Sequence, residues 1–499
     1  MKRRFCFFVA VLLFLSFAVL SLYGFYFSKH LKQEPLPFIR DATRYELEGE
    51  FFPEKRVFSG KEIVYYKNNE KDPLKELFFH VYPNAFSAEE TAPFTADEMS
   101  LAYPEGFSKG GITIKKVAED NTPLIFKVEG TLLNVSLKRE LKPGDEIKLS
   151  IEFEVLLPKS PGRFGYYKRT YNFGNWYPIL CVYDEKGWHK DPYYKIGDPF
   201  YSDIAFYKFI LYAPPDYKIA STGRIIEKKE ENHRTKWVIE SGPVRDFAFI
   251  LSREFEMLKG NVGEIEVISY YFKDDRESGA KALEIGKKAI KYFSEIFGPY
   301  IYDTYSVVAA DFYMGGMEYP NLVLIDRNLY KNKDNILLEY VVVHETAHQW
   351  WYGIVGNDEV NEPWLDEALA EYSTVNYFEK YYGKRQGTEI YENFILNPYK
   401  FYELSRKTGP ILRPLNEFID WKEYDAAVYK KGAIMLKELE KRISKQKFIN
   451  VLKNYYKQNQ LKNATTEDFI KAVNGTSGTD FRGLIYQMLK EEGELEQAA

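Results

Sequence analysis

The hydrophobic pattern of this chain changes its period near residue 270. Between about 40 and 255, apolar and polar residues alternate, as in 75–82, 146–155 and 205–212, and this alternation is typical of half-buried antiparallel strands. From 278 to 297 the apolar residues recur at helical spacing instead. Because strands and helices bury their apolar residues in different layers, the two patterns in succession predict a multidomain α+β fold.

The pattern divides the chain into segments. Residues 29–255 are predicted to form a β-rich domain, either a sandwich or an extended saddle, and residues 256–430 a domain of mixed strands and helices. Residues 431–499 are predicted to form a short C-terminal helical segment, in which Thr465 and Asp468 resemble a capping box. Breaks in the helical segment are expected near Ser444, Asn463 and Asn474.

The N-terminus carries a membrane or export signal. Three basic residues at 2–4 precede an uncharged apolar run at 5–27, which as a helix is about 35 Å long, enough for a hydrocarbon core of about 30 Å. The run lacks a small-x-small cleavage site at its end, so residues 1–28 are predicted to be an uncleaved transmembrane anchor. The basic cluster places the N-terminus in the cytoplasm and the body outside. A secreted protein with a cleaved signal peptide is the alternative.

Composition excludes several classes of site. The chain has only Cys6 and Cys181, so neither a disulfide framework nor a cysteine-based zinc site is expected. Its 68 basic and 73 acidic residues are nearly balanced, without a strong basic block, and nucleic acid is therefore not an expected partner. Any metal ion must be held by histidines and carboxylates, and the oligomeric state is left open.

Two histidines four residues apart are the clearest indication of a functional site. His344 and His348 lie in the apolar segment 341–350, and residues at i and i+4 share one face of a helix, so both imidazoles can reach one metal ion. Glu345 is rotated from His344 by about 100°, which places it beside such an ion as a catalytic base. The alternative is a buried helix whose histidines are satisfied by hydrogen bonds.

A carboxylate at a suitable spacing completes the ligand set. Glu367 follows His348 after 18 residues, near the start of a second amphipathic helix. Two histidines and one glutamate hold zinc and leave a position open for water, so one Zn²⁺ per chain is the predicted cofactor. Glu371, one turn further on, is either an acceptor for a ligand histidine or part of a solvated helix face. Asp366 is expected behind the ligands or at the surface.

Motifs around these residues resemble the aminopeptidase N family of gluzincin metallopeptidases. The His-Glu-x-x-His pattern and the glutamate after it have that family's spacing, and Trp-Leu-Asp-Glu-Ala-Leu-Ala-Glu-Tyr at 364–372 is similar to its Trp-Leu-Asn-Glu-Gly-Phe-Ala block. Gly-Gly-Met-Glu-Tyr at 315–319 resembles its Gly-x-Met-Glu-Asn exopeptidase motif. Tyr-Lys-Lys-Gly at 429–432 is similar to its Tyr-x-Lys-Gly. The resemblance implies a thermolysin-like catalytic domain over 256–430.

The resemblance also implies a role for each matching residue. Glu318 would bind the free α-amine of a peptide substrate, because a buried ammonium needs a carboxylate partner. Tyr429 would donate its hydroxyl to the oxyanion of the tetrahedral intermediate. The backbone of Gly315, Gly316 and Met317 would pair with the substrate as an added strand. The plainer alternatives are a surface loop for Glu318 and a core aromatic for Tyr429.

Three features depart from the family pattern. Tyr319 stands where the exopeptidase motif ends in asparagine, a residue that helps to set the loop in relatives. The segment 172–184 replaces the family's strand with a glutamine that assists amine binding, and it offers no match for that glutamine. The helical part at 431–499 is shorter than the C-terminal domain of many relatives.

The sequence thus predicts a zinc metalloaminopeptidase that acts on peptides. A zinc endopeptidase with the same metal chemistry is the first alternative, and a membrane-anchored binding protein with a structural metal is the second. Retention of Glu345 and Tyr429 disfavours the second, because neither residue is needed merely to hold zinc. Phe312, Tyr313 and Tyr319 predict a pocket for apolar or aromatic substrate side chains.

Overall fold

The computed structural model describes residues 37–493, and the contacts divide the chain into two compact units, 1–42 and 43–499. The first unit contributes a 3₁₀ turn, η1 (Pro37–Asp41). The predicted membrane anchor, 1–28, lies outside the described residues. Within residues 37–493, no helix is both long and apolar enough to cross a membrane.

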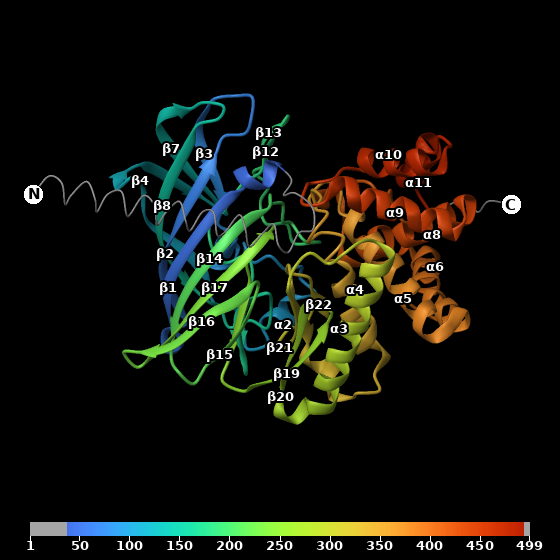
Figure 1. The fold of residues 1–499 in the computed structure, drawn as a ribbon, viewed down its shortest axis with the longest axis horizontal. Coiled ribbons are helices and arrows are strands. Elements are labelled where there is room, and N and C mark those ends of the chain that lie inside the picture. Colours follow the sequence, from blue (N-terminus) through green and yellow to red (C-terminus); the bar gives the residue numbers. More distant parts are fainter. Residues whose placement is uncertain (1–36, 494–499) are drawn as a thin grey trace, which may run out of the picture. The chain divides into compact units, whose positions relative to one another are not determined.

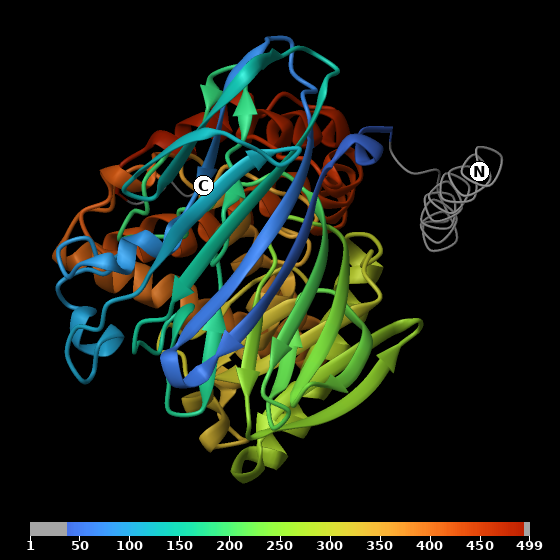
Figure 2. The same ribbon diagram turned by 90° about the vertical axis from the view of Figure 1, so that its left-hand side faces the viewer.

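The β-rich part is built on an eight-stranded sheet in the order β16-β17-β14-β1-β2-β8-β4-β5. Figure 2 shows it as one twisted layer. Strands β1 and β14 run parallel, whereas the other neighbours are antiparallel. Along β8 buried residues alternate with more exposed ones, as its sequence predicts. The strands are β1 (Thr43–Phe52), β2 (Val57–Lys67), β4 (Gly111–Glu119), β5 (Thr122–Pro123), β8 (Glu146–Leu156), β14 (Ala205–Ala213), β16 (Arg224–Glu231) and β17 (Arg234–Val244).

Smaller sheets accompany the large one. Two have four strands, in the orders β15-β18-β10-β9 and β11-β3-β7-β6, and β12 pairs with β13. Their strands are β3 (Leu74–His80), β6 (Ile125–Glu129), β7 (Leu132–Leu141), β9 (Phe164–Tyr167), β10 (Thr170–Phe173), β11 (Ile179–Leu180), β12 (Tyr183–Asp184), β13 (Gly187–Trp188), β15 (Lys218–Ser221) and β18 (Phe249–Ser252). Short helical turns in this part are η2 (Pro53–Lys55), η3 (Tyr82–Ser87) and α2 (Met99–Ala102).

Aromatic side chains fill the space between the large sheet and the sheet that contains β10 and β18. The ring centre of Phe58 in β2 lies 4.8 Å from that of Trp176, and the centres of Phe209 in β14 and Phe249 in β18 are 5.1 Å apart. Phe173 of β10 stacks on Phe249 at 4.2 Å. Each such pair contributes about 0.5–1.5 kcal/mol beyond the area that it buries. The high aromatic content of 17% therefore serves in part to hold two sheets together.

A five-stranded mixed sheet in the order β19-β20-β21-β23-β22 forms the centre of the molecule's second half. Helix α3 packs on β20 and on α4, and α4 packs on α5. Strand β22, only two residues long, lies at the edge of the sheet and pairs antiparallel with β23. The elements are β19 (Phe255–Val262), β20 (Ile265–Phe272), η4 (Lys273–Asp275), α3 (Arg276–Ile296), β21 (Thr304–Ala310), β22 (Gly316–Met317), β23 (Leu322–Asp326), η5 (Arg327–Lys331), α4 (Ile336–Ala347) and α5 (Trp364–Tyr391).

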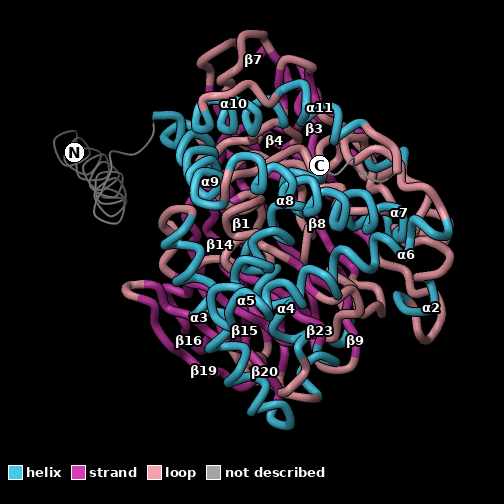
Figure 3. The backbone as a smooth tube through the Cα atoms, turned by 90° about the vertical axis from the view of Figure 1, so that its right-hand side faces the viewer, coloured by secondary structure: helices cyan, strands magenta, loops and turns pink. Residues whose placement is uncertain are grey.

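The remaining helices follow α5 in the sequence, and several of them pack against it. Figure 1 places the strands of the β-rich part on the left and these helices on the right, and Figure 3 shows α8, α9 and α10 above α3, α4 and α5. Two segments have π-helical hydrogen bonding, η6 (Glu392–Leu396) and η8 (Asp425–Lys431). The others are α6 (Asn397–Ser405), η7 (Leu415–Glu417), α7 (Trp421–Tyr424), α8 (Gly432–Ile443), α9 (Lys445–Asn459), α10 (Thr466–Ser477) and α11 (Arg482–Lys490).

The architecture is therefore α+β, with a β-rich N-terminal part and a helical C-terminal part, as the sequence predicts. The capping box at Thr465 and Asp468 is confirmed. The break predicted near Asn474 comes three residues later, because α10 continues to Ser477 and ends at Gly478, where a φ of 75° suits glycine. Because one compact unit contains 43–499, the domain boundaries at 255 and 430 remain predictions.

Candidate metal centre

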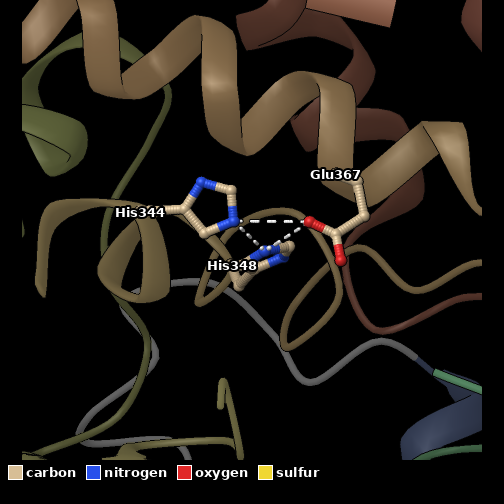
Figure 4. A group of neighbouring side chains, drawn as sticks. All are labelled: His344, His348 and Glu367. Atoms are coloured by element: carbon tan, nitrogen blue, oxygen red, sulfur yellow. Dashed lines mark hydrogen bonds and ion pairs between the residues drawn. The ribbon is translucent and has the colours of Figure 1, made fainter. Parts of the chain in front are cut away.

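The two histidines of the predicted pair lie on one face at the C-terminal end of α4. Their Nε2 atoms are 3.1 Å apart, and Figure 4 shows both rings turned toward the same point. The Nδ1 atom of His348 lies 3.0 Å from the main-chain oxygen of Trp351. Because a carbonyl oxygen can only accept, Nδ1 carries the proton in the neutral ring, and Nε2 is left with a lone pair for a metal ion.

Glu367 reaches the same point from the first turn of α5. Its Oε2 atom lies 3.3 Å from the Nε2 atom of His344 and 3.3 Å from that of His348. Burial raises the pKa of this carboxyl, but the two imidazoles outweigh that effect and hold the pKa at about 2. Glu367 is therefore ionised at neutral pH.

The three side chains fit a metal ion. All three are buried, and their donor atoms lie within 4.8 Å of one another. Among residues 37–493, the Oε2 atom of Glu367 has no hydrogen-bond partner, although a buried carboxylate oxygen normally has one. A cation between the imidazoles would satisfy it, and two nitrogens with one carboxylate oxygen are a donor set that suits zinc.

Glu345 lies in the same pocket as the candidate ligands. It is buried, and its pKa is raised above the usual range, first by burial and then by the charge of Glu318. Gly316 of the edge strand β22 packs directly on the Glu345 carboxyl, and a Cβ at that position would collide with it. The glycine therefore lets the edge strand approach the predicted base.

Glu318 directly follows β22. Its side chain is 4% exposed, and within the described part of the chain its Oε1 atom has no hydrogen-bond partner. Burial and the nearby charge of Asp198 raise the pKa of Glu318 to about 8. The surface-loop alternative is therefore wrong for Glu318.

Tyr429 projects from the π-helical segment η8, and π-helical turns are frequent at functional sites. Its hydroxyl donates a hydrogen bond to Oε1 of Glu367, and its ring centre lies 6.0 Å from that of His344. The sequence-predicted site residues thus come together in one pocket. Its lining includes Gly315, Gly316, Met317, Glu318, His344, Glu345, His348, Glu367 and Tyr429.

Glu371 lies behind His344 and is only 1% exposed. Its Oε1 atom lies 2.6 Å from Nζ of Lys430, and its Oε2 atom accepts a hydrogen bond from the hydroxyl of Tyr340 and lies 4.0 Å from Nδ1 of His344. The solvated-face alternative is therefore wrong for Glu371. Asp366 is also buried and accepts a hydrogen bond of 2.8 Å from Nδ2 of Asn357.

Several pocket residues were not predicted from the sequence. Arg163 and Asp198, a buried ion pair, come from loops of the β-rich part, and Trp421 and Lys430 come from the helical part. Of these only Lys430, which follows Tyr429 within a recognised motif, carried a local signal.

The aromatic pocket predicted from Phe312, Tyr313 and Tyr319 does not form as expected. Phe312 is 2% exposed and Tyr319 is fully buried, so both belong to the core. The hydroxyl of Tyr313 donates a hydrogen bond of 3.3 Å to Glu98. Met314 and Trp421 line the pocket instead.

A second group of possible metal ligands, Glu318, His348 and Asp366, also lies within the described residues. It shares His348, whose Nε2 atom already faces His344 and Glu367. The two groups therefore compete for one imidazole, and the first is the better supported site.

The comparison with known families agrees with this geometry. Residues 281–488 match the model of the peptidase family M1 domain, and this span contains Glu318, His344, Glu345, His348, Glu367 and Tyr429. Within residues 281–488 the chain therefore resembles the peptidase family M1 domain. The resemblance to the aminopeptidase N family is thereby confirmed.

Curated relatives of this chain include aminopeptidase N of Haemophilus influenzae, which is 26% identical over 52% of this chain and 32% of its own length. The probable aminopeptidase 2 of Sulfurisphaera tokodaii is 23% identical over 77% of this chain and 49% of its own length. The chain therefore spans about a third to a half of the length of the curated relatives it matches.

Solved structures share the fold of this chain over nearly all of its length. The M1 zinc metallopeptidase of Deinococcus radiodurans has a TM-score of 0.63 at 16% identity and covers 90% of this chain and 94% of its own. A mutant of that protein bound to a Tyr-Ser-Ala substrate has a TM-score of 0.65 at 16% identity, with 92% and 96% covered.

Proposed function

We propose that this protein is a zinc metalloaminopeptidase of peptidase family M1 that removes N-terminal residues from peptides. The observation that carries the proposal is the convergence of His344, His348 and Glu367 with two further buried carboxylates, Glu345 and Glu318, in one pocket. The thermolysin-like character of residues 256–430 belongs to the same proposal, as do peptides as substrates.

Each residue of the pocket would have its own role in peptide hydrolysis. A zinc ion held by the two histidines and Glu367 supplies a Lewis acid that polarises a carbonyl oxygen and makes water more acidic. Glu345 takes a proton from the attacking water and passes it to the nitrogen of the leaving amine. Tyr429 turns its hydroxyl from Glu367 toward the developing oxyanion. Glu318 pairs with the substrate's α-ammonium, which fixes the cleaved bond at the first residue.

The free edge of β22 supports an extended substrate. Gly316 and Met317 pair with β23 on one side only, and Gly316 packs on Glu345. A peptide added to the open side of this edge would run beside the predicted base.

A substrate panel tests the proposal directly. Dipeptides and amino-acid arylamides, each with a free and a blocked amine, are incubated with the purified protein with and without a zinc chelator. We expect hydrolysis of the free-amine substrates alone, abolished by the chelator and restored by added zinc. Cleavage of blocked peptides would indicate the endopeptidase alternative, and inertness toward all substrates would favour a binding protein with a structural metal.

Glu318→Ala should separate recognition of the amine from the chemical step. Removing a charged hydrogen-bond partner of the ammonium costs about 1.5–3 kcal/mol, so we expect kcat/KM for free-amine arylamides to fall about 10- to 100-fold. Any activity on blocked substrates should change little, and the zinc content should stay at one per chain. Equal losses on both kinds of substrate would assign Glu318 a structural role.

Glu371→Gln should weaken zinc binding, although Glu371 is not one of the predicted zinc ligands. The charge of Glu371 lies beside the Nδ1 edge of His344 and is held there by Lys430 and Tyr340. Loss of such a supporting carboxylate lowers metal affinity about 10- to 100-fold. Competition against a fluorescent chelator measures the change, and Glu379→Gln on the outer part of α5, whose side chain is 29% exposed, serves as the control. Equal zinc affinities in the two variants would contradict this role.

We further propose that residues 1–28 anchor the protein in the membrane, with the catalytic part outside the cytoplasm. The support is the sequence alone: the basic residues at 2–4 and the apolar run at 5–27. Membrane fractionation followed by protease treatment of intact cells tests this topology. Recovery of a soluble protein that lacks residues 1–28 would support the secreted alternative.

A further inference from the structure

Glu318 needs its carboxylate held in a fixed place if it is to select an α-ammonium. Part of the support comes from the segment that carries the two histidines. Nε2 of Gln349, the residue after His348, donates to the main-chain oxygen of Tyr319 at 3.2 Å, and its Oε1 accepts from the main-chain nitrogen of Asn321 at 2.6 Å. These bonds hold the backbone on one side of the loop that carries Glu318.

The side chain of Tyr319 supplies a second support from the β-rich part. Its ring is fully buried, and its hydroxyl lies 3.0 Å from Oδ1 of Asn175. Nδ2 of Asn175 lies 2.6 Å from Oδ2 of Asp246. A carboxylate can only accept, so the amide nitrogen of Asn175 faces Asp246, its oxygen faces Tyr319, and the tyrosine hydroxyl is the donor. We call this chain of hydrogen bonds the Tyr319 network.

The β-rich part is shaped to receive this tyrosine. A Cβ at Gly174 would collide with the hydroxyl of Tyr319, so a glycine is required there. Asn175 has a φ of 51°, a left-handed conformation that asparagine adopts more readily than most residues. The ring and its hydroxyl therefore occupy a place that the segment 172–176 leaves open.

Asp246, the last member of the Tyr319 network, is itself held firmly. Its Oδ1 atom accepts hydrogen bonds from the main-chain nitrogen of Phe247 at 2.6 Å and from the hydroxyl of Tyr177 at 3.3 Å. The indole nitrogen of Trp176 donates to the main-chain oxygen of Phe247 at 3.0 Å. The network thus ends on the core of the β-rich part rather than on a surface loop.

The contact between Tyr319 and Asn175 joins two departures from the family pattern. Tyr319 replaces the asparagine of the exopeptidase motif. Gly174 and Asn175 lie in the segment that offers no match for the family's glutamine. We infer that Tyr319, Asn175 and Asp246 are positioning residues that hold Glu318 against the substrate amine from the β-rich part. The inference rests on the proposed aminopeptidase function. It makes selection of the amine depend on contact between parts of the chain about 140 residues apart.

The test compares a pair of competitive inhibitors of zinc-loaded enzyme that differ only in the amine and have no bond to cleave, L-phenylalanine and 3-phenylpropanoate. The ratio of their inhibition constants measures how strongly the site uses the amine. In Tyr319→Phe, which keeps the ring, we expect this ratio to fall about tenfold, as the loss of one buried hydrogen bond near a charged group predicts. Binding of 3-phenylpropanoate and the zinc content should stay at wild-type values.

Two further variants make the test specific. Asn175→Ala should reduce the ratio to a similar extent, and the double variant should add little, because both changes break the same chain of bonds. Tyr330→Phe is the matched control: that ring is also buried, and within residues 37–493 its hydroxyl has no hydrogen-bond partner, so the ratio should not change.

The outcomes separate this inference from the proposed function. A wild-type ratio near one would contradict amine recognition itself and overturn both. A large wild-type ratio that Tyr319→Phe and Asn175→Ala leave intact would overturn the positioning role alone. A fall in the ratio confined to these two variants and their combination, with zinc content retained, would support it.

Discussion

Glu345→Gln should lower kcat by about 10²- to 10⁴-fold while one zinc ion per chain is retained. Glutamine has nearly the same size as glutamate and can occupy the same place against Gly316, but it cannot accept the proton of the attacking water. His344, His348 and Glu367 are unchanged, so the metal site should persist. Steady-state rates on a free-amine arylamide, together with metal analysis of the purified variant, measure both quantities.

Glu339→Gln is the matched control for this change. Glu339 lies on the same helix and is also buried, but it accepts hydrogen bonds from the hydroxyls of Tyr377 and Tyr382 and is not among the residues that line the pocket. Its amide oxygen can still accept those bonds, so kcat should stay close to the wild-type value. A Glu345→Gln variant with zinc bound and wild-type turnover would remove Glu345 from the mechanism.

The metal centre could be predicted from the sequence because its geometry is local. Helical spacing alone places His344 and His348 on one face, and Glu367 needs only the start of the next helix. Glu318 and Tyr429 are different, because only their resemblance to family motifs indicated a role. The seven-residue π-helical segment around Tyr429 departs from the 3.6-residue repeat on which helix prediction depends.

The parts of the site supplied by the β-rich domain could not be predicted in this way. Arg163 and Asp198 lie in loops without periodic signal, and tertiary packing brings them to the pocket beside His344 and Glu367. Tyr319 illustrates the same limit. Its sequence position beside Glu318 indicated a substrate pocket. In the structure its side chain instead packs against Gly174 and Asn175 of the β-rich part.

Arg245 joins three parts of the chain around the end of the metal-binding helix. It follows β17, is 2% exposed, and donates from Nε to the main-chain oxygen of Tyr352 at 2.7 Å. Its Nη1 atom donates to the main-chain oxygen of Ser202 at 3.0 Å, and its Nη2 atom donates to that of Lys462 in the loop between α9 and α10. Gly356 packs so closely on the guanidinium that a Cβ would collide with it.

The residue that accepts the hydrogen bond from Nε of Arg245, Tyr352, has a strained backbone conformation. Tyr352 has a φ of 115°, a conformation that a bulky residue adopts only when its surroundings impose it. The preceding residue, Trp351, provides the main-chain oxygen that fixes the ring of His348. Through Tyr352, Arg245 therefore lies one residue from the main-chain oxygen that contacts the predicted ligand His348.

Arg245→Ala should be the most destabilising single change among those considered. It leaves the buried main-chain oxygen of Tyr352 and the partly buried one of Ser202 without this donor, removes one of two donors to the main-chain oxygen of Lys462, and opens a cavity beside Gly356. Unpaired acceptors shielded from water cost about 1–3 kcal/mol each, so we expect the free energy of unfolding to fall by about 2–5 kcal/mol, a large loss for one substitution. Denaturant unfolding of the zinc-loaded protein measures the loss, and zinc affinity should fall with it because Tyr352 is released.

Arg253→Ala is the control for this prediction. It tests whether the fall in the free energy of unfolding depends on the burial of Arg245 or follows the removal of any arginine. Arg253 pairs with Asp216 at 2.6 Å and lies over the ring of Tyr217, but its side chain is 51% exposed. An exposed ion pair contributes at most about 1 kcal/mol, so this variant should unfold close to the wild type and bind zinc as tightly. If both variants lost the same free energy of unfolding, the contacts of Arg245 would contribute no more than those of an exposed arginine. The strained backbone at Tyr352 would then be held by its other neighbours.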